Sequence, residues 1–424
     1  MIISMTSTDT SSHILTELAN LRLAAAGLNR VSPSSLNDCL LKLADLTEAN
    51  MAPILKANAL DLARMDPENP KYDRLLLNED RLQAIAADLR RVAALPSPLG
   101  VVHEANTLAN GLELSRVSVP IGVVGIVFES RPNVTFDVFA LNLKAGNASV
   151  LKGSRDARDS NLAIKQVIDE ALASTGLPPA CYLAPAEREA LGPILKADGL
   201  VDVIIPRGSQ GLIDFVRANS SVPVIETGAG ICHTYVDADA NLEWAKAIIT
   251  NAKSRRVSVC NALDCLLVHN DHLGVLHDMI FDLGEDHNCV VYADPDAFAA
   301  TIGLYPGELL EATEESFGTE FLSMKMSIKC VDDISEAISH VERYGSRHSE
   351  TIVSNNPENI QRYLKEVDAA VVYANASTAF TDGGQFELGA EIGISTQKLH
   401  ARGPMGLAAL TSYKWLVRGE GQVR

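Results

Sequence analysis

Apolar residues recur at helical spacing through the first hundred residues of the chain. They predict amphipathic helices over residues 36–50, 51–65 and 81–95. Pro96 and Pro98 follow the last of these, where proline would end a helix. The N-terminal part of the chain is therefore expected to be helical.

The spacing changes over residues 111–120, where Leu112, Leu114, Val117 and Val119 alternate with polar or small residues. An alternating pattern is typical of a strand with one exposed face. This segment is predicted to be an exposed edge strand or part of a hairpin, separate from the strands that follow it.

From residue 123 onward, uninterrupted apolar runs alternate with helical patterns. Continuous apolar runs are typical of parallel strands buried on both faces. The expected strands are 123–128, 149–151, 201–205 and 223–225, and the expected helices are 135–144, 161–174 and 210–218. Such alternation predicts a doubly wound α/β sheet.

A second alternating α/β unit follows. Strands are expected at 263–269, 350–353 and 369–373, and helices at 241–250, 332–344 and 357–367. Residues 383–406 are rich in glycine and polar residues and are too long for a simple turn, so a functional loop is expected there.

Composition limits the kind of protein. A chain of 424 residues is too long for one ordinary core, so two or three domains are expected. The net charge of −18 disfavours nucleic acid or an anionic membrane surface as a partner. No apolar run approaches the roughly 20 residues of a membrane span, and residues 1–12 lack the basic and apolar regions of a signal peptide. Seven scattered cysteines without a C-x-x-C pair fit a reducing compartment, so the expected location is the cytoplasm.

Cys260 is the strongest candidate for a catalytic group. Lys253, Arg255 and Arg256 precede it, and nearby positive charge lowers the pKa of a thiol. A thiolate that follows a dinucleotide-type fold indicates covalent aldehyde or acyl chemistry coupled to hydride transfer. The alternative is a buried structural thiol, which is the more common role of a free cysteine and the one expected for Cys265.

Two segments are candidates for binding a cofactor. Lys152, Ser154 and Arg155 follow a predicted strand at the place where NAD-selective folds carry an acidic residue, so they favour the 2′-phosphate of NADPH or NADP. The alternative is a solvated charged loop. Residues 206–211 lead from a strand into a helix, whose N-terminal amides would suit phosphate, although such loops also occur without a ligand.

Two further features have open interpretations. Glu226, before the glycines at 228 and 230, is either a general base or a structural carboxylate. The histidines and the cysteine between residues 269 and 289 match no tight metal-ligand spacing, so no metal is expected.

Several stretches also match a known family. They are VPIGVVG at 119–125, FESRPNVT at 128–135, IPRGS at 205–209, ETGAG at 226–230, VCNAL at 259–263, VYANAST at 372–378 and GAEIGISTQKLHARGPMG at 389–406. With these stretches, the chain resembles the γ-glutamyl phosphate reductase family of the aldehyde dehydrogenase superfamily. The resemblance runs from the first helices to Trp415.

This resemblance implies an α/β, aldehyde dehydrogenase-like fold with a doubly wound cofactor domain, an α/β catalytic domain and a small oligomerisation hairpin. The implied divisions are N-terminal helices of the cofactor domain (1–108), the oligomerisation hairpin (109–120), the NADP-binding domain (121–229), the catalytic domain (230–385) and a C-terminal loop and oligomerisation tail (386–424).

The implied activity is the NADPH-dependent reduction of L-glutamate 5-phosphate to L-glutamate 5-semialdehyde with release of phosphate. The reaction would pass through a thioester at Cys260 and form the second step of proline biosynthesis. The chain is expected to be a homo-oligomer, a dimer or a dimer of dimers, and channelling with glutamate 5-kinase is a further expectation.

The expected site residues fall into three groups. The catalytic group is Cys260, with Asn133 as a side-chain amide donor to the oxyanion. The cofactor group is Lys152, Ser154, Arg155, Gly208, Ser209 and Glu320. The substrate group is Arg131, Arg256, Asn375, Ser377 and Thr378.

Two other functions remain open from the sequence. One is a hydrolytic aldehyde dehydrogenase with Glu226 as its base, which would need no phosphate. The other is a catalytically silent oligomer of the same fold, against which the intact Cys260 and glycine loops argue.

Overall fold

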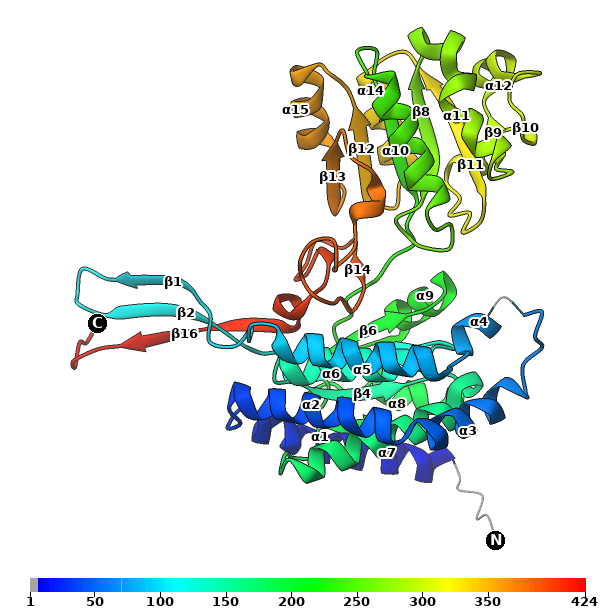
Figure 1. Ribbon diagram of the computed structural model, residues 1–424. Helices are drawn as coiled ribbons and strands as arrows, with labels where there is room; N and C mark the ends of the chain where they lie inside the picture. The colour runs from blue at the N-terminus through cyan, green and yellow to red at the C-terminus, as the bar shows by residue number, and fades with distance from the viewer. Residues whose placement is uncertain (1–6, 70) are drawn as a thin grey trace. The chain divides into compact units, whose positions relative to one another are not determined.

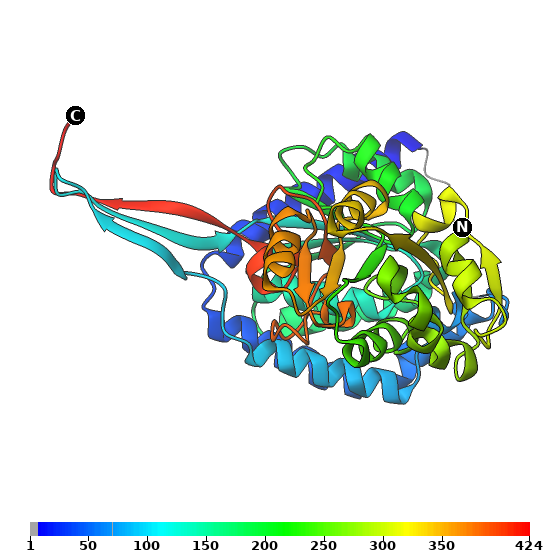
Figure 2. The ribbon, with the colours of Figure 1, turned by 90° about the horizontal axis from the view of Figure 1, so that it is seen from above.

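The computed structural model describes residues 7–69 and 71–424. The chain divides into two compact units, shown in Figures 1 and 2. The first is the cofactor-type unit, which comprises Met1–Thr227, Leu388–Gly393 and Met405–Arg424. The second is the cysteine unit, which comprises Gly228–Glu387 and Ile394–Pro404. The expectation about a signal peptide at residues 1–12 falls partly outside the described residues. Within the described ranges, no helix is long and apolar enough to cross a membrane.

A four-stranded parallel sheet forms the centre of the cofactor-type unit. Its order is β5-β4-β3-β6, with β3 at Val123–Phe128, β4 at Ala148–Lys152, β5 at Cys181–Leu183 and β6 at Val203–Arg207. Every residue of β3 and β4 is buried, as the continuous apolar runs predicted. The sheet is therefore covered on both faces.

The connections explain how both faces are covered. Helices α6 (Asn133–Lys144) and α7 (Arg158–Ser174) lead from β3 to β4 and from β4 to β5, so right-handed crossovers place both on one face. The chain then returns past β3 to reach β6, which places α8 (Leu191–Leu195) on the opposite face, in contact with α1 (Ser7–Leu28). The remaining helices of this unit are α2 (Pro33–Ala49), α3 (Met51–Leu62), α4 (Tyr72–Leu75), α5 (Glu79–Ala94) and α9 (Gln210–Asn219).

A separate three-stranded antiparallel sheet belongs to the same unit. It contains β1 (Val102–Thr107), β2 (Glu113–Pro120) and β16 (Thr411–Arg418), which run together as a narrow ribbon in both views. Residues 111–120 were expected to form an edge strand or hairpin strand. The hairpin with β1 is present, but the edge position was wrong, because β2 lies in the centre, paired with β1 on one side and β16 on the other.

The cysteine unit contains a seven-stranded parallel sheet of order β10-β9-β11-β8-β7-β12-β13. Its strands are β7 (Cys232–Val236), β8 (Leu263–His269), β9 (Val290–Ala293), β10 (Leu309–Glu311), β11 (Lys325–Val331), β12 (Ser349–Val353) and β13 (Val371–Ala374). Its helices are α10 (Leu242–Ser254), α11 (Leu276–Glu285), α12 (Pro295–Thr301), α13 (Glu314–Phe317), α14 (Ile334–Tyr344) and α15 (Pro357–Glu366).

The two faces of this sheet have separate hydrophobic cores. Along β8, Leu266 and Val268 pack into the core that contains residues of α10 and α11, whereas Cys265 and Leu267 pack into the core of α14 and α15. The alternation follows from the twofold periodicity of a strand. Consecutive residues of β7 and β8 therefore face different surroundings.

Two expected segments differ in the structure. Residues 223–225 make only an isolated bridge between Val224 and Ile204, because Pro223 has no N–H to extend the pairing. The expected loop at 383–406 is mostly irregular but includes the short pair β14 (Ile394–Ser395) and β15 (Gly403–Pro404).

Candidate active site

Cys260 lies on the loop between α10 and β8 of the cysteine unit. All seven cysteines belong to the described part of the chain; six are buried and Cys260 is partly exposed. Arg255 and Arg256 on the same loop are exposed. The loop thus carries a partly exposed thiol and two exposed arginines.

Lys253 does not contribute to this positive charge in the way the sequence suggested. Its side chain is fully buried, and Nζ lies 3.3 Å from Oδ1 of Asp264. Burial raises the pKa of Asp264 to about 6, although the Lys253 ammonium opposes this rise. The pair fixes the end of α10 against the start of β8 beneath the loop.

The residue after the cysteine anchors the loop. Asn261 is buried, and its Nδ2 donates to the carbonyl oxygens of Ala379 (3.3 Å) and Thr381 (2.9 Å). In return, Oγ1 of Thr378 donates to the carbonyl oxygen of Asn261 at 2.9 Å. Residues 378–381, at the end of the VYANAST segment and just beyond it, therefore hold the backbone beside Cys260 in place.

A glycine turn supports the loop from another direction. A Cβ at Gly230 would overlap the carbonyl group of Cys260, so only glycine fits there. The N–H of Gly230 donates to Oε1 of Glu320 at 2.8 Å, and Sγ of Cys232 donates to the carbonyl oxygen of Cys260 at 3.2 Å. The sequence marked Gly230, the last residue of ETGAG, only as a glycine that allows close approach to a ligand, and it did not mark Cys232, the first residue of β7, as part of the site.

The expected substrate residues of the cysteine unit mostly have structural partners. Asn375 adopts a φ of 57°, and its side chain pairs with the backbone N–H and carbonyl of Ser354, at 2.9 Å each. Oγ of the buried Ser377 accepts from the N–H of Ala379 at 3.2 Å. Contact of Asn375, Ser377, Thr378 and Arg256 with a substrate remains a prediction.

Arg131 and Asn133 belong to the cofactor-type unit, at the start of α6. Nδ2 of Asn133 donates to Oδ2 of Asp137 at 3.0 Å. Burial raises the pKa of Asp137 to about 6, against the lowering effect of Arg207. Asp137 therefore orients the Asn133 amide, and the oxyanion role of Asn133 and the substrate role of Arg131 remain predictions.

A pocket of about 530 Å³ opens at the carboxyl edge of the sheet in the cofactor-type unit. This edge is the usual ligand position in open α/β sheets. It is lined by Val127, Phe128, Glu129, Lys152, Gly153, Ser154, Arg155, Ala186, Arg188, Glu189, Leu191, Gly211, Leu212 and Phe215. The structure thus brings the three expected cofactor residues 152, 154 and 155 together at one pocket.

Lys152 and Arg155, the two cations among the expected cofactor residues, have different surroundings. Lys152 is buried and donates to the carbonyl oxygens of Gly153 (2.9 Å) and Ala186 (3.1 Å), and burial lowers its pKa to about 8. Arg155 is largely exposed, with Nη2 3.9 Å from Oε2 of Glu189. Arg155 is therefore the freer of the two to reach a ligand phosphate.

A carboxylate lies at the expected phosphate cradle. Glu129, at the end of β3, accepts from the N–H of Ser209 (3.2 Å) and from its Oγ (3.1 Å), so it caps α9. A Cβ on Gly208 would lie 3.0 Å from Cδ of Glu129, so the glycine permits this approach. Sequence reasoning missed Glu129 because strands β3 and β6 become neighbours only in the fold.

Glu320 and Glu226, two other residues singled out from the sequence, do not line this pocket. Glu320, expected to bind cofactor, belongs to the cysteine unit and supports Gly230 there. Glu226, the alternative base, pairs with Nη1 of Arg217 at 3.4 Å within the cofactor-type unit.

The comparison with known proteins agrees with this architecture. No family model matches the chain. The γ-glutamyl phosphate reductase of Chlorobium phaeobacteroides (strain BS1) is 56% identical over 413 residues, covering 97% of this chain and 99% of that protein. The crystal structure of γ-glutamyl phosphate reductase from Thermotoga maritima matches with a TM-score of 0.93 and 39% identity over 97% of this chain and 99% of that one.

A more distant structure shows the wider fold class. An acetylating aldehyde dehydrogenase from Geobacillus thermoglucosidasius covers 100% of both chains with a TM-score of 0.70 at 16% identity, which is a likeness of fold alone. The expected aldehyde dehydrogenase-like α/β fold is confirmed, and by its identity to relatives over nearly its whole length the chain belongs to the γ-glutamyl phosphate reductase family.

Proposed function

We propose that this chain is an oxidoreductase that reduces L-glutamate 5-phosphate to L-glutamate 5-semialdehyde with release of inorganic phosphate, the second step of proline biosynthesis. The observation that carries the proposal is Cys260, a partly exposed thiol on a loop fixed by Asn261 and Gly230, in a chain of this family.

Cys260 acts as the nucleophile in this proposal. Its thiolate attacks the acyl carbon of the substrate, an S–C bond forms, and the C–O bond to phosphate breaks, so that a γ-glutamyl thioester and free phosphate result. After reduction of the thioester carbon, the tetrahedral thiohemiacetal collapses to the aldehyde and returns the thiolate. Arg256, exposed on the same loop as Cys260, is the candidate in this unit for holding an anionic part of the substrate.

The pocket of the cofactor-type unit fits a nicotinamide dinucleotide. Its cations suit a phosphate, the Glu129 and Glu189 carboxylates suit ribose hydroxyls, and the rings of Phe128 and Phe215 offer apolar surface. When bound, the cofactor supplies the hydride. We infer NADPH rather than NADH because Lys152, Ser154 and Arg155 surround the place where a 2′-phosphate would be recognised.

The direct test follows NADPH oxidation with glutamate 5-phosphate generated in the same vessel by a kinase. We expect one phosphate released for each NADPH oxidised. Run in reverse, glutamate 5-semialdehyde and NADP should yield NADPH only when phosphate is supplied, because phosphate must attack the Cys260 thioester. Steady NADPH formation in phosphate-free buffer would instead establish the hydrolytic alternative.

We also infer a homo-oligomer that uses the sheet of β1, β2 and β16. Tyr413, Trp415 and Val417 alternate along β16 and are each about half exposed, so they form an apolar stripe on one face of an edge strand. Soluble proteins rarely leave such an edge uncovered. A second copy of the chain is the proposed cover.

A further inference from the structure

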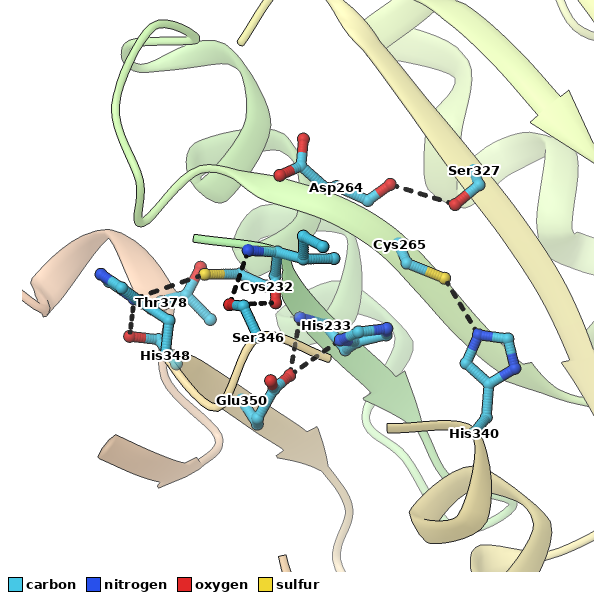
Figure 3. A network of polar contacts seen from close by, with 12 residues as sticks. Cys232, His233, Asp264, Cys265, Ser327, His340, Ser346, His348, Glu350 and Thr378 are labelled. Atoms are coloured by element: carbon cyan, nitrogen blue, oxygen red, sulfur yellow. Dashed lines mark hydrogen bonds and ion pairs between the residues drawn. The ribbon is translucent and has the colours of Figure 1, made fainter. Parts of the chain in front are cut away.

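A cluster of buried metal-binding side chains lies in the cysteine unit, on the opposite side of β8 from the core of α10 and α11. His233 on β7 and Cys265 on β8 are cross-strand partners, and His340 comes from α14, which covers this face (Figure 3). Their ligand atoms all lie within 4.8 Å of one another. His233 and Cys265 are 0% exposed and His340 is 7% exposed.

One ring nitrogen of His233 is held by a carboxylate. Nδ1 of His233 lies 3.0 Å from Oε2 of Glu350, which also accepts from the His233 N–H at 2.8 Å. Glu350 is the partner of His233 in the register between β12 and β7, so the sheet itself sets this contact. A carboxylate on one ring nitrogen is the usual outer contact of a metal-bound histidine, since it directs the other nitrogen to the ion.

The other ring nitrogen of His233 lacks a partner. Among the described residues, Nε2 of His233 is buried without a hydrogen bond, and Figure 3 shows it on the side of the ring away from Glu350, toward Cys265 and His340. A buried polar atom without a partner lowers stability, because it has lost its hydrogen bonds to water without replacement. A ligand at this point would remove that cost.

The spacing fits a metal ion. Sγ of Cys265 lies 3.6 Å from Nε2 of His340. Metal–sulfur and metal–nitrogen bonds of about 2.3 and 2.0 Å at a tetrahedral angle separate the two ligand atoms by about 3.5 Å. The ligand atoms of Cys265 and His340 therefore already have the spacing of two ligands of one ion, and that of His233 lies within 4.8 Å of both.

Charge also fits a divalent ion. A dipositive ion, the Cys265 thiolate and the Glu350 carboxylate together carry no net charge, which suits a site buried to this degree.

We propose that His233, Cys265 and His340 bind one thiophilic transition-metal ion, Zn²⁺ in the first place, with Glu350 as the outer carboxylate that orients His233. The ion ties β7 and β8 to α14 in the unit that carries Cys260. Three protein ligands leave the fourth tetrahedral position for solvent. The same two-histidine, one-cysteine set also suits copper, so the test distinguishes the two ions.

The test uses the full chain with Cys260→Ser, which removes the partly exposed thiol. Titration with Co²⁺ under anaerobic conditions should saturate at one ion per chain and produce a thiolate-to-cobalt charge-transfer band. Zn²⁺ should displace cobalt and abolish the band. If Cu⁺ binds and neither Co²⁺ nor Zn²⁺ does, the site is supported and its ion is copper.

Matched variants locate the site. Cys265→Ser and His340→Gln should each abolish the band, and Glu350→Gln should keep it while weakening Co²⁺ binding about 10- to 100-fold. Cys330→Ser, which changes another buried thiol outside the cluster, should leave binding unchanged. Circular dichroism shows whether each variant is folded. If Cys265→Ser does not fold, His340→Gln provides the test of the site.

The proposal is overturned if the Cys260→Ser protein binds none of the three ions. It is also overturned if the band survives both Cys265→Ser and His340→Gln, or disappears in Cys330→Ser. None of these measurements depends on reductase activity, so their failure would leave the proposed function untouched.

Discussion

Cys260 differs from the other cysteines by its surroundings rather than by its sequence neighbours alone. Burial raises the pKa of Cys181 to about 12 and that of Cys289 to about 11, so these thiols stay protonated near neutral pH. Cys260 is partly exposed on a loop with two exposed arginines. Burial in a low-dielectric core therefore makes Cys181 and Cys289 poor nucleophiles, whereas Cys260 lies outside such a core.

Replacing the nucleophile should stop the reaction without unfolding the protein. Cys260→Ala is expected to lower kcat by several orders of magnitude, because a covalent step has no alternative route. Cys330→Ala, in the core on β11, should instead keep turnover and lose about 1 kcal/mol of stability. Steady-state kinetics and urea unfolding measure the two effects. Near-normal kcat in Cys260→Ala would rule out the thioester.

The proposed preference for NADPH can also be tested at a single residue. Arg155→Ala should raise the KM for NADPH about tenfold, which corresponds to about 1.4 kcal/mol for a contact between a largely exposed arginine and phosphate, and should leave the KM for NADH nearly unchanged. Arg158→Ala is the matched control, since Arg158 is exposed nearby but does not line the pocket. Equal effects of Arg155→Ala on both cofactors would mean that Arg155 does not recognise the 2′-phosphate.

The sequence predicted some of these residue environments and not others. A thiol between a helix and a buried strand could be recognised from the apolar run that begins at Ala262. The pairing of Lys253 with Asp264 could not, since basic residues before a cysteine look alike whether they are buried or exposed. Nor could the capping of α9 by Glu129, which depends on the pairing of β3 with β6.

At the scale of elements, the turn before β7 and the loop before β8 act as one unit. Gly230→Ala should displace the Cys260 backbone, because the added Cβ would overlap its carbonyl group. A displacement of about 1 Å is enough to lower kcat about 100-fold. Gly274→Ala, where a Cβ meets nothing within 4 Å, should be close to wild type. Equal kcat in the two variants would show that the turn does not position the nucleophile.

Elements with continuous apolar runs were the easiest to predict. The expected strands 123–128 and 263–269 coincide with β3 and β8, because burial on both faces leaves a clear pattern. Strand β7 was missed, since it carries His233 and Thr234 at fully buried positions. Glu350 of β12 pairs with the N–H and Nδ1 of His233, a contact that no local pattern reveals.

At the scale of the whole molecule, the three-stranded sheet joins distant parts of the chain. Strand β16 pairs with β2 along its full length although the whole stretch from Pro120 to Thr411 lies between them in the sequence. A local pattern shows that residues 113–120 form a strand but not which strand will pair with it. The central position of β2 therefore could not be predicted from alternation alone.

The exposed stripe on β16 leads to a test of assembly. Arg116 lies over the rings of Tyr413 and Trp415, at 4.9 and 5.9 Å from their centroids, and this contact restricts both aromatic side chains. Aromatic rings that are already ordered lose little entropy when a partner covers them. This face is accordingly expected to bury against a second copy, which gives a mass that is a multiple of 45.5 kDa.

Trp415→Lys should break that assembly, because it places a charge in the middle of the apolar stripe. Sedimentation equilibrium of the variant should give a single chain of 45.5 kDa. Leu23→Lys is the matched control: Leu23 is 74% exposed on α1, so the same change there should leave the assembly intact. If Trp415→Lys keeps the wild-type mass, the stripe on β16 is not the contact that holds the copies together.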